Sequence, residues 1–245
     1  MKVKSDPNTS SFKEEKSLSD FIHRIGHDIG NPLTSLISLA SLLERSSPES
    51  NFQLSAEDNN KYLKSIIADA WRVQALMEKT VIILSDRTGS EESTCNVGEV
   101  VQHSISKLLR KPAFQRFDIT FSPPQIAITA KITRSHLEWL ITELLSNALN
   151  HLSLSEEGPE LPVFVRLEQK DRWVILEVEN SYVSTNEPDP KSLFEPFVKF
   201  PESSKGAGLG LTAASFLLTR SNSELFIDLD KVNKSFTLTV QLPSA

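Results

Sequence analysis

The chain has 245 residues, 39% of them hydrophobic, and a formal net charge of −6. This length and apolar content suit one large or two modest globular domains. The negative charge argues against a nucleic-acid-binding surface, which needs a clustered positive field. Cys95 is the only cysteine, which excludes a disulfide framework and favours a reducing compartment. The sequence has no apolar run of membrane-spanning length and no signal-peptide core, so we expect a cytoplasmic protein without direct membrane insertion.

Residues 17–86 carry the pattern of two long amphipathic helices joined by a polar loop, after a flexible N-terminus at residues 1–16. The apolar positions of the first helix recur in steps of three and four residues: Leu18, Ile22, Ile25, Ile29, Leu36, Leu39 and Leu43. Those of the second helix are Leu63, Ile66, Ala70, Val73, Met77 and Leu84. One helical hairpin cannot cover both of its apolar faces, so the pattern predicts a homodimer that forms a four-helix bundle.

The stretch GHDIGNPLTS, at residues 26–35 of the first helix, contains a glycine and a proline that helix propensity disfavours. His27 is two residues from both Ile25 and Ile29, which turns it away from the apolar stripe and toward solvent. Asp28 is adjacent and can hold the tautomer that leaves the other ring nitrogen nucleophilic. Taken alone, such a pair on a helix is more often an ordinary solvated histidine beside an acid.

Residues 87–94 are polar and aperiodic and are interpreted as a linker to a second domain at residues 95–245. Helical patterns occur in NVGEVVQHSISKLL and SHLEWLITELLSNALNHL, and again after Gly210. Strand alternation occurs in FDITF, VFVRLEQ, RWVILEVE, ELFIDLD and SFTLTVQL. This order predicts an α+β fold in which helices cover one face of a mostly antiparallel sheet.

The motif HDIGNPL resembles the phosphoacceptor box of two-component sensor histidine kinases. The resemblance implies that His27 accepts a phosphoryl group and that Asp28 acts as its general base. Asn31 is then the residue that orients water when the partner is dephosphorylated. Pro32 is explained as a kink that lets the helix flex near the acceptor.

The second domain resembles the ATP-binding domain of the same family, an α/β sandwich. LITELLSNALNHL resembles its asparagine box, which implies that Asn147, with Glu143 one turn earlier, binds Mg²⁺. LFEPFVKF resembles the phenylalanine box that hinges a lid, and KGAGLGL resembles the glycine-rich turn that approaches the phosphates. The implied nucleotide-binding residues, for the cofactors ATP and Mg²⁺, are Phe194, Phe197, Lys199, Lys205, Gly206, Gly208, Leu209 and Gly210, with Asn150 and Asn180 discussed next.

Three positions depart from the family pattern and predict weak ATP binding. Asn180, or less favourably Glu179, stands where the family has the aspartate that binds adenine, and no glycine follows it. An asparagine oxygen can accept a bond from the adenine amine but lacks the charge that strengthens it. Asn150 and Ser223 replace a basic residue and a glycine, losses for which Lys199 and Lys205 can compensate.

Three functions follow as alternatives. The first is a kinase that moves the γ-phosphoryl group of ATP to His27 and then to an aspartate in the receiver domain of a response regulator. The second is a histidine phosphotransfer protein whose ATP-like domain is degenerate, and the third is a regulatory scaffold without phosphoryl chemistry. Because about 16 residues precede the first helix, we expect the input to come from a separate sensor protein or from a segment outside this sequence.

Overall fold

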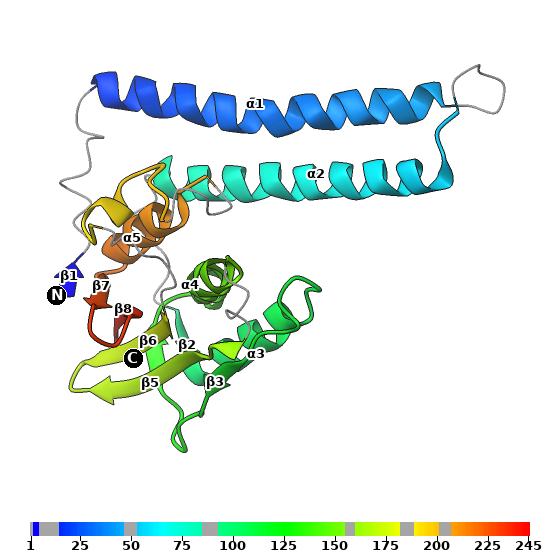
Figure 1. Cartoon of the computed structure of the whole chain (residues 1–245). Coiled ribbons are helices and arrows are strands. Elements are labelled where there is room, and N and C mark those ends of the chain that lie inside the picture. Colours follow the sequence, from blue (N-terminus) through cyan, green and yellow to red (C-terminus); the bar gives the residue numbers. More distant parts are fainter. Residues whose placement is uncertain are drawn as a thin grey trace. The chain divides into compact units, whose positions relative to one another are not determined.

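The computed structural model describes residues 2–4, 15–46, 53–84, 93–154, 160–181, 189–200 and 207–245. The chain divides into two compact units (Figure 1). One consists of Ser11–Leu84, and the other combines Met1–Ser10 with Ser85–Ala245. Within the described ranges, no helix has the length and apolar character needed to cross a bilayer.

The first unit is the helical hairpin that the sequence predicted. Helix α1 spans Glu15–Arg45 and helix α2 spans Ala56–Leu84, and the two pack along their length (Figure 1). Phe21 and Ile25 of α1 and Leu76 of α2 are buried. Helix α1 continues through Pro32, which cannot donate a hydrogen bond to the carbonyl of Asp28.

A second apolar face of the hairpin is left open. Its members are exposed although they are large and hydrophobic: Ile22, Leu33 and Ile37 on α1, and Leu63, Ile67, Met77 and Val81 on α2. By contrast, Ile29, Leu36, Leu39 and Leu43 of the predicted stripe are half-buried within the hairpin. We refer to the exposed set as the open apolar face.

The second unit is built on a six-stranded sheet with the order β1-β7-β8-β6-β5-β3. Its strands are β1 (Lys2–Lys4), β3 (Ile119–Phe121), β5 (Val163–Lys170), β6 (Trp173–Ser181), β7 (Glu224–Asp230) and β8 (Ser235–Pro243). All neighbours pair antiparallel except β3 and β5, which are parallel. Strands β2 (Thr94–Asn96) and β4 (Thr129–Lys131) form a separate antiparallel pair.

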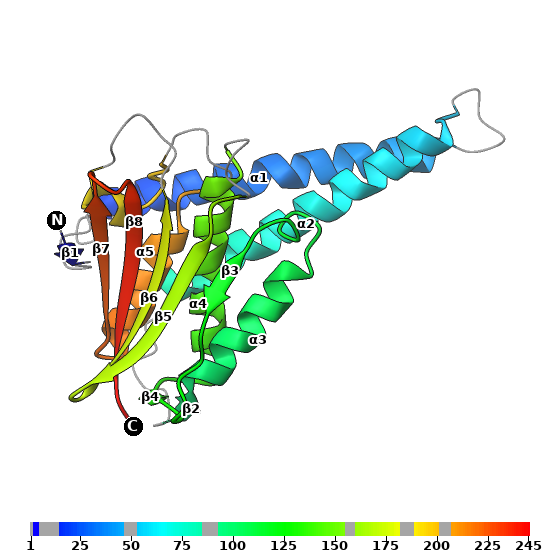
Figure 2. The same cartoon turned by 60° about the horizontal axis from the view of Figure 1, so that its bottom comes forward.

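Helices α3 (Val97–Leu109), α4 (Arg134–Leu152) and α5 (Gly210–Arg220) lie on one face of the sheet (Figure 2). The strands turn alternate apolar side chains toward these helices: Val174, Leu176 and Val178 of β6 are almost fully buried. Helix α4 opposes them with a wide apolar face, and its N-terminus is capped by the Thr133 hydroxyl, which accepts from the His136 N–H at 3.3 Å. The predicted α+β fold is confirmed.

Three short strands were not predicted. β2 and β4 have three residues each, too few to show a two-residue period. β1 lies within residues 1–16, which we expected to be a flexible N-terminus, yet Lys2–Lys4 pair with the edge of β7 and Val3 is 7% exposed. β1 forms because it pairs with β7, which is distant in sequence, and the local sequence pattern of residues 2–4 does not predict that pairing.

Candidate functional site

His27 lies on α1 with its side chain 67% exposed, as the helical phase predicted. Its Nδ1 atom is 3.5 Å from Asp28 Oδ1 and 3.4 Å from Asn31 Nδ2. Both neighbours approach the same ring nitrogen, so Nε2 is the nitrogen that neither of them engages. The three predicted acceptor residues therefore form one local group within a single turn of helix.

The two contacts to Nδ1 favour opposite tautomers of His27. The Asp28 carboxylate can only accept, so its contact requires a proton on Nδ1 and leaves a lone pair on Nε2. An amide nitrogen can only donate, so the contact with Asn31 Nδ2 requires an unprotonated Nδ1 and places the proton on Nε2. Only the tautomer that Asp28 favours makes Nε2 a nucleophile.

Glu143 and Asn147 lie one turn apart on α4 and meet the first residue of α5. A Cβ atom at Gly210 would overlap the Glu143 carboxylate and would lie 3.6 Å from Asn147 Nδ2. The absence of a side chain at Gly210 thus lets the two helices bring these oxygen-bearing groups to the α5 N-terminus. Leu209, at the N-cap position, has no side-chain acceptor for the first N–H groups of α5.

Phe194 and Phe197 are anchored to the glycine-rich turn. The Thr212 hydroxyl donates to the Phe194 carbonyl at 3.0 Å, and the Phe197 N–H donates to the Gly208 carbonyl at 2.9 Å. Gly208 has φ +70°, and a Cβ there would lie 2.6 Å from the carbonyl carbon of Phe197. Phe197 itself has φ 68°, a conformation that costs a non-glycine residue about 1–2 kcal/mol. This close backbone contact is the reason that glycine is required at position 208.

Asn180 and Glu179 point to opposite faces of β6. Asn180 is 4% exposed on the helix-covered face, and its Nδ2 donates to the Ser181 carbonyl at 2.9 Å. Glu179 lies on the other face, where Arg166 Nη1 is 2.6 Å from its carboxylate. The structure therefore places Asn180, and not Glu179, on the side of the sheet that carries Asn147 and Gly210.

The other residues named from the sequence are Asn150, Lys199, Lys205, Gly206 and Ser223. Asn150 is half-buried, and its carbonyl accepts from the Ser153 hydroxyl at 2.7 Å. Lys199 is exposed, and Ser223 is buried in the turn before β7. Lys205 and Gly206 lie outside the described residues.

Two family models match the chain over most of its length. The His Kinase A (phospho-acceptor) domain matches residues 17–81. The Histidine kinase-, DNA gyrase B-, and HSP90-like ATPase family matches residues 132–245. The chain belongs to the sensor histidine kinases.

Individual relatives agree with this family. The alginate biosynthesis sensor protein KinB of Pseudomonas aeruginosa is 25% identical over 207 residues, which cover 80% of this chain and 32% of KinB. The sensor histidine kinase YvrG of Bacillus subtilis is 22% identical over 237 residues, or 93% of this chain and 39% of YvrG. The chain thus spans about a third of the length of KinB and about two fifths of the length of YvrG.

A solved structure shows the same fold. The histidine kinase ThkA, in complex with response regulator protein TrrA, is matched with a TM-score of 0.67 at 17% sequence identity. The match covers 93% of this chain and 62% of the other.

His151 was not predicted as a site residue. It lies one turn after Asn147 on α4, and its ring stacks on Phe200 with centroids 6.0 Å apart and an interplanar angle of 19°. Burial lowers the pKa of the His151 imidazole, and a hydrogen bond with the Phe200 backbone opposes this effect. Its position one turn beyond Asn147, on the same helix face, was the signal in the sequence that could have identified it.

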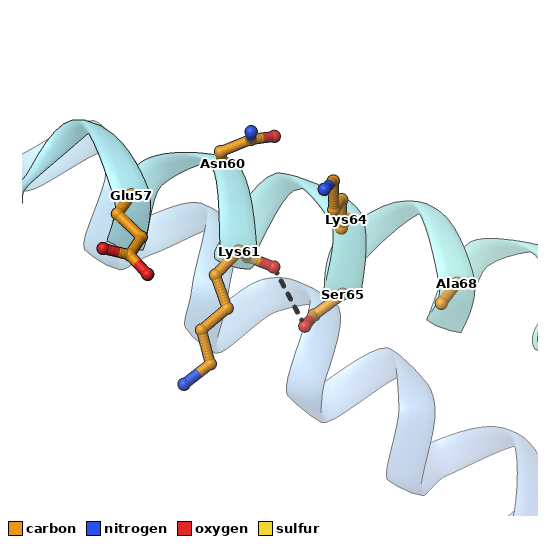
Figure 3. Close-up of a pocket in the computed structure, with 6 residues that line it drawn as sticks. All are labelled: Glu57, Asn60, Lys61, Lys64, Ser65 and Ala68. Atoms are coloured by element: carbon orange, nitrogen blue, oxygen red, sulfur yellow. Dashed lines mark hydrogen bonds between the residues drawn. The ribbon is translucent and has the colours of Figure 1, made fainter.

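The hairpin also carries an open groove on α2 with a volume of about 480 Å³. Figure 3 shows the residues that line it. It is lined by Glu57, Asn60, Lys61, Lys64, Ser65 and Ala68. The Ser65 hydroxyl donates to the Lys61 carbonyl, and both lysine side chains are exposed (Figure 3). This groove was not predicted from the sequence.

Proposed function

We propose that this histidine kinase core transfers the γ-phosphoryl group of ATP to Nε2 of His27 and then to an aspartate of a response regulator. The observation that carries the proposal is the exposed His27 ring, whose Nδ1 faces Asp28 while Nε2 is directed away from both neighbours. This is the arrangement that a nucleophilic imidazole requires.

The first step forms one bond and breaks one. The Nε2 lone pair attacks the γ-phosphorus, the bond from that phosphorus to the oxygen bridging to the β-phosphate breaks, and ADP leaves. The ring then carries a positive charge, which Asp28 stabilises by accepting the Nδ1 proton in a hydrogen bond. In the second step a regulator carboxylate oxygen attacks the same phosphorus, the bond from Nε2 to that phosphorus breaks, and its electron pair returns to His27, which becomes neutral.

The nucleotide contacts come from the second unit. The N-terminus of α5, with Gly208 and Gly210, supplies N–H groups for the phosphates, as helix N-termini do for anions. Lys199, Lys205, Gly206 and Asn150 are further proposed phosphate contacts. The hydrogen bonds of Phe194 with Thr212 and of Phe197 with Gly208 hold residues 194–197 beside the glycine-rich turn.

The residues at the α4–α5 contact fit Mg²⁺. Glu143 and Asn147 offer the hard oxygen ligands that this cation prefers, in the space that Gly210 leaves without a side chain. Among the described residues, no group of three or more His, Cys, Asp or Glu could hold a metal by itself. Glu143 and Asn147 would therefore hold Mg²⁺ together with oxygens of the ATP phosphates. When bound, Mg²⁺ would neutralise phosphate charge.

Adenine recognition is the weak part of the site. Asn180 lies on the helix-covered face of β6, as an adenine-binding residue must. However, its side chain is neutral, and its amide nitrogen already donates a hydrogen bond to the Ser181 carbonyl. This observation favours a second candidate function, a histidine phosphotransfer protein that receives the phosphoryl group from a phosphorylated partner. A regulatory scaffold without phosphoryl chemistry is the third alternative.

The open apolar face supports a homodimer. Seven large hydrophobic side chains exposed along one hairpin exceed what a single soluble unit normally leaves in water. A second copy covers this face in a four-helix bundle.

The regulator is proposed to dock on the same hairpin, with the groove on α2 as a polar contact surface.

We place this core in the cytoplasm, where ATP and receiver domains are found. Its input signal is proposed to come from a sensor module or from a separate sensor protein.

One experiment tests these alternatives. Purified protein is incubated with γ-labelled ATP and Mg²⁺, and the expected result is label that is acid-labile and base-stable and is lost in His27→Gln. If ATP gives no label while a phosphorylated receiver domain labels His27, phosphotransfer is the better account. Absence of label from both donors would leave only the scaffold.

A further inference from the structure

The edge of strand β7 is covered by residues from the N-terminal end of the chain. β1 pairs antiparallel with β7, with Lys2 opposite Asp228, Val3 opposite Ile227 and Lys4 opposite Phe226. β8 occupies the other edge of β7, so over these residues β1 changes β7 from an edge strand into an internal one. An uncovered edge would offer its backbone groups to any extended segment.

Side chains fix the register of this pair but do not make it strong. Val3 is 7% exposed and lies on the same face as the fully buried Ile227. Lys4 Nζ is 2.6 Å from Glu224 Oε1, and both side chains keep contact with solvent. An exposed ion pair adds little stability, and three residue pairs make a short ladder. The pairing of β1 with β7 therefore forms in the folded protein but adds little stability, so β1 can detach at a small cost in free energy.

Docking of β1 connects the ATP-binding unit to the hairpin a second time. Residues 85–93 link the end of α2 to β2, and residues 5–14 link β1 to the start of α1. The start of α1 and the end of α2 belong to the same end of the antiparallel hairpin. Within the unit, β1 is at an edge of the six-stranded sheet and β2 is in the separate pair, so the two attachment points are apart (Figure 2).

We propose that the β7 edge is a docking site for an extended lysine–apolar–lysine strand, that Lys2–Lys4 occupy it in cis, and that this docking restrains the ATP-binding unit. The proposal rests on the proposed kinase function. His27 must be reached in turn by the ATP site and by a regulator, so the ATP-binding unit has to approach and withdraw. A body attached at one point can rotate freely about it, whereas one attached at two separate points cannot.

Chain lengths indicate that the restraint is partial. Ten extended residues reach at most ~36 Å. His27 lies 12 residues after the first residue of α1, which is about 18 Å along the helix. The linker is therefore long enough for the ATP-binding unit to approach His27 while β1 stays docked. Docking limits only the orientations that the ATP-binding unit samples. We expect several-fold changes in rate and no complete loss.

The test compares released and locked strands in the full chain. Val3→Asp places a charge against Ile227 and releases β1, and Val3→Ile is the matched control. In a Cys95→Ser background, Lys2→Cys with Asp228→Cys locks the strand on oxidation, because register partners in antiparallel strands have Cα distances that a disulfide accepts. Labelling of His27 from ATP is expected to be several-fold faster in Val3→Asp and several-fold slower in the oxidised lock, with recovery on reduction.

Two further readouts separate this proposal from the kinase assignment. Hydrogen exchange of the β7 amides is expected to quicken in Val3→Asp and not in Val3→Ile, which reports docking without ATP. Small-angle scattering of Val3→Asp is expected to show a broader distance distribution than Val3→Ile, which reports the restraint without ATP. If the wild type takes no label, the kinase function fails and scattering still decides the restraint. Equal scattering of the two variants, or equal labelling of the oxidised and reduced lock, would overturn the restraint.

Discussion

The proposed acceptor site on the hairpin and the proposed nucleotide site of the second unit are built in different ways. His27, Asp28 and Asn31 lie within one turn of one helix, so the helix alone brings them together. Glu143, Gly210, Phe197 and Asn180 come from four elements that meet only when the sheet and its helices have packed. A local site depends on the identity of its residues, and an assembled site depends also on the spaces between its elements. Substitutions should therefore act differently in the two regions.

The largest effect is expected at the local site. His27→Gln removes the nucleophilic nitrogen and should abolish labelling from ATP, while the melting-temperature increase caused by Mg·ATP remains. His23→Gln, one turn earlier on α1, is the control and should label normally. Labelling that survives in His27→Gln and disappears in His23→Gln would show that the acceptor has been misassigned.

The next largest effect concerns the open apolar face that lies on the same helix. Ile37 is 67% exposed in a single hairpin, so Ile37→Asp should leave the hairpin folded but bury an unpaired charge between two copies, at a cost of several kcal/mol. Light scattering at micromolar protein should then report monomers. Ser38→Asp adds the same charge at the adjacent exposed position and should remain dimeric. A dimer that survives Ile37→Asp with unchanged heat stability would mean that this face has no partner copy.

A one-carbon addition should be enough to break the assembled site. Gly210→Ala places a Cβ where the Glu143 carboxylate lies, and that flexible side chain must move. We expect at least a tenfold loss of Mg·ATP affinity, or about 1.4 kcal/mol, by calorimetry. Gly98→Ala is a matched control, since its Cβ would meet only ordinary contacts at 3.5 Å or more in the first turn of α3. Equal affinities in the two variants would place the metal and phosphates elsewhere.

Asn180→Asp sharpens the comparison from the opposite direction, because here a substitution should improve the site. A carboxylate would strengthen the bond to the adenine amine, by about 1 kcal/mol and hence several-fold in ATP affinity. The same change replaces the amide that donates to the Ser181 carbonyl, so the protein without nucleotide should melt at a lower temperature. Calorimetry and melting curves measure both quantities. An unchanged affinity would remove Asn180 from the nucleotide site.

The smallest effect is expected from protonation of His151. Burial lowers the pKa of this imidazole in the folded state, so below about pH 6.5 the unfolded chain binds the proton more readily than the folded one. The free energy of unfolding should therefore fall as pH falls from about 7.5 to about 5.5. His151→Phe keeps an aromatic ring against Phe200 and cannot take a proton, so its stability should fall less over this range. Parallel pH profiles of the two proteins in urea unfolding would contradict this assignment.

Strand periodicity could have settled one ambiguity of the sequence analysis. Val174, Leu176 and Val178 occupy every second position of β6, and Glu177 occupies the intervening position before Val178, so the same two-residue step leads to Asn180 and away from Glu179. The structure confirms this alternation, with Glu179 paired to Arg166 on the outer face. In contrast, no period could have revealed that Gly210 makes room for Glu143, since that contact joins residues 67 positions apart.

The sequence by itself determined the helical hairpin, the direction of His27, its neighbours Asp28 and Asn31, and the α+β class of the second domain. These features follow from periods of 3.6 and 2 residues, which are properties of a single element. Only the tertiary structure decided that Thr212 and Gly208 hold the Phe194–Phe197 segment, which apolar residues of the hairpin stay exposed, and that Lys2–Lys4 cover the edge of β7. Each of these depends on backbone groups and apolar surfaces from distant segments, whose pairing is set by packing of the whole unit and carries no local pattern.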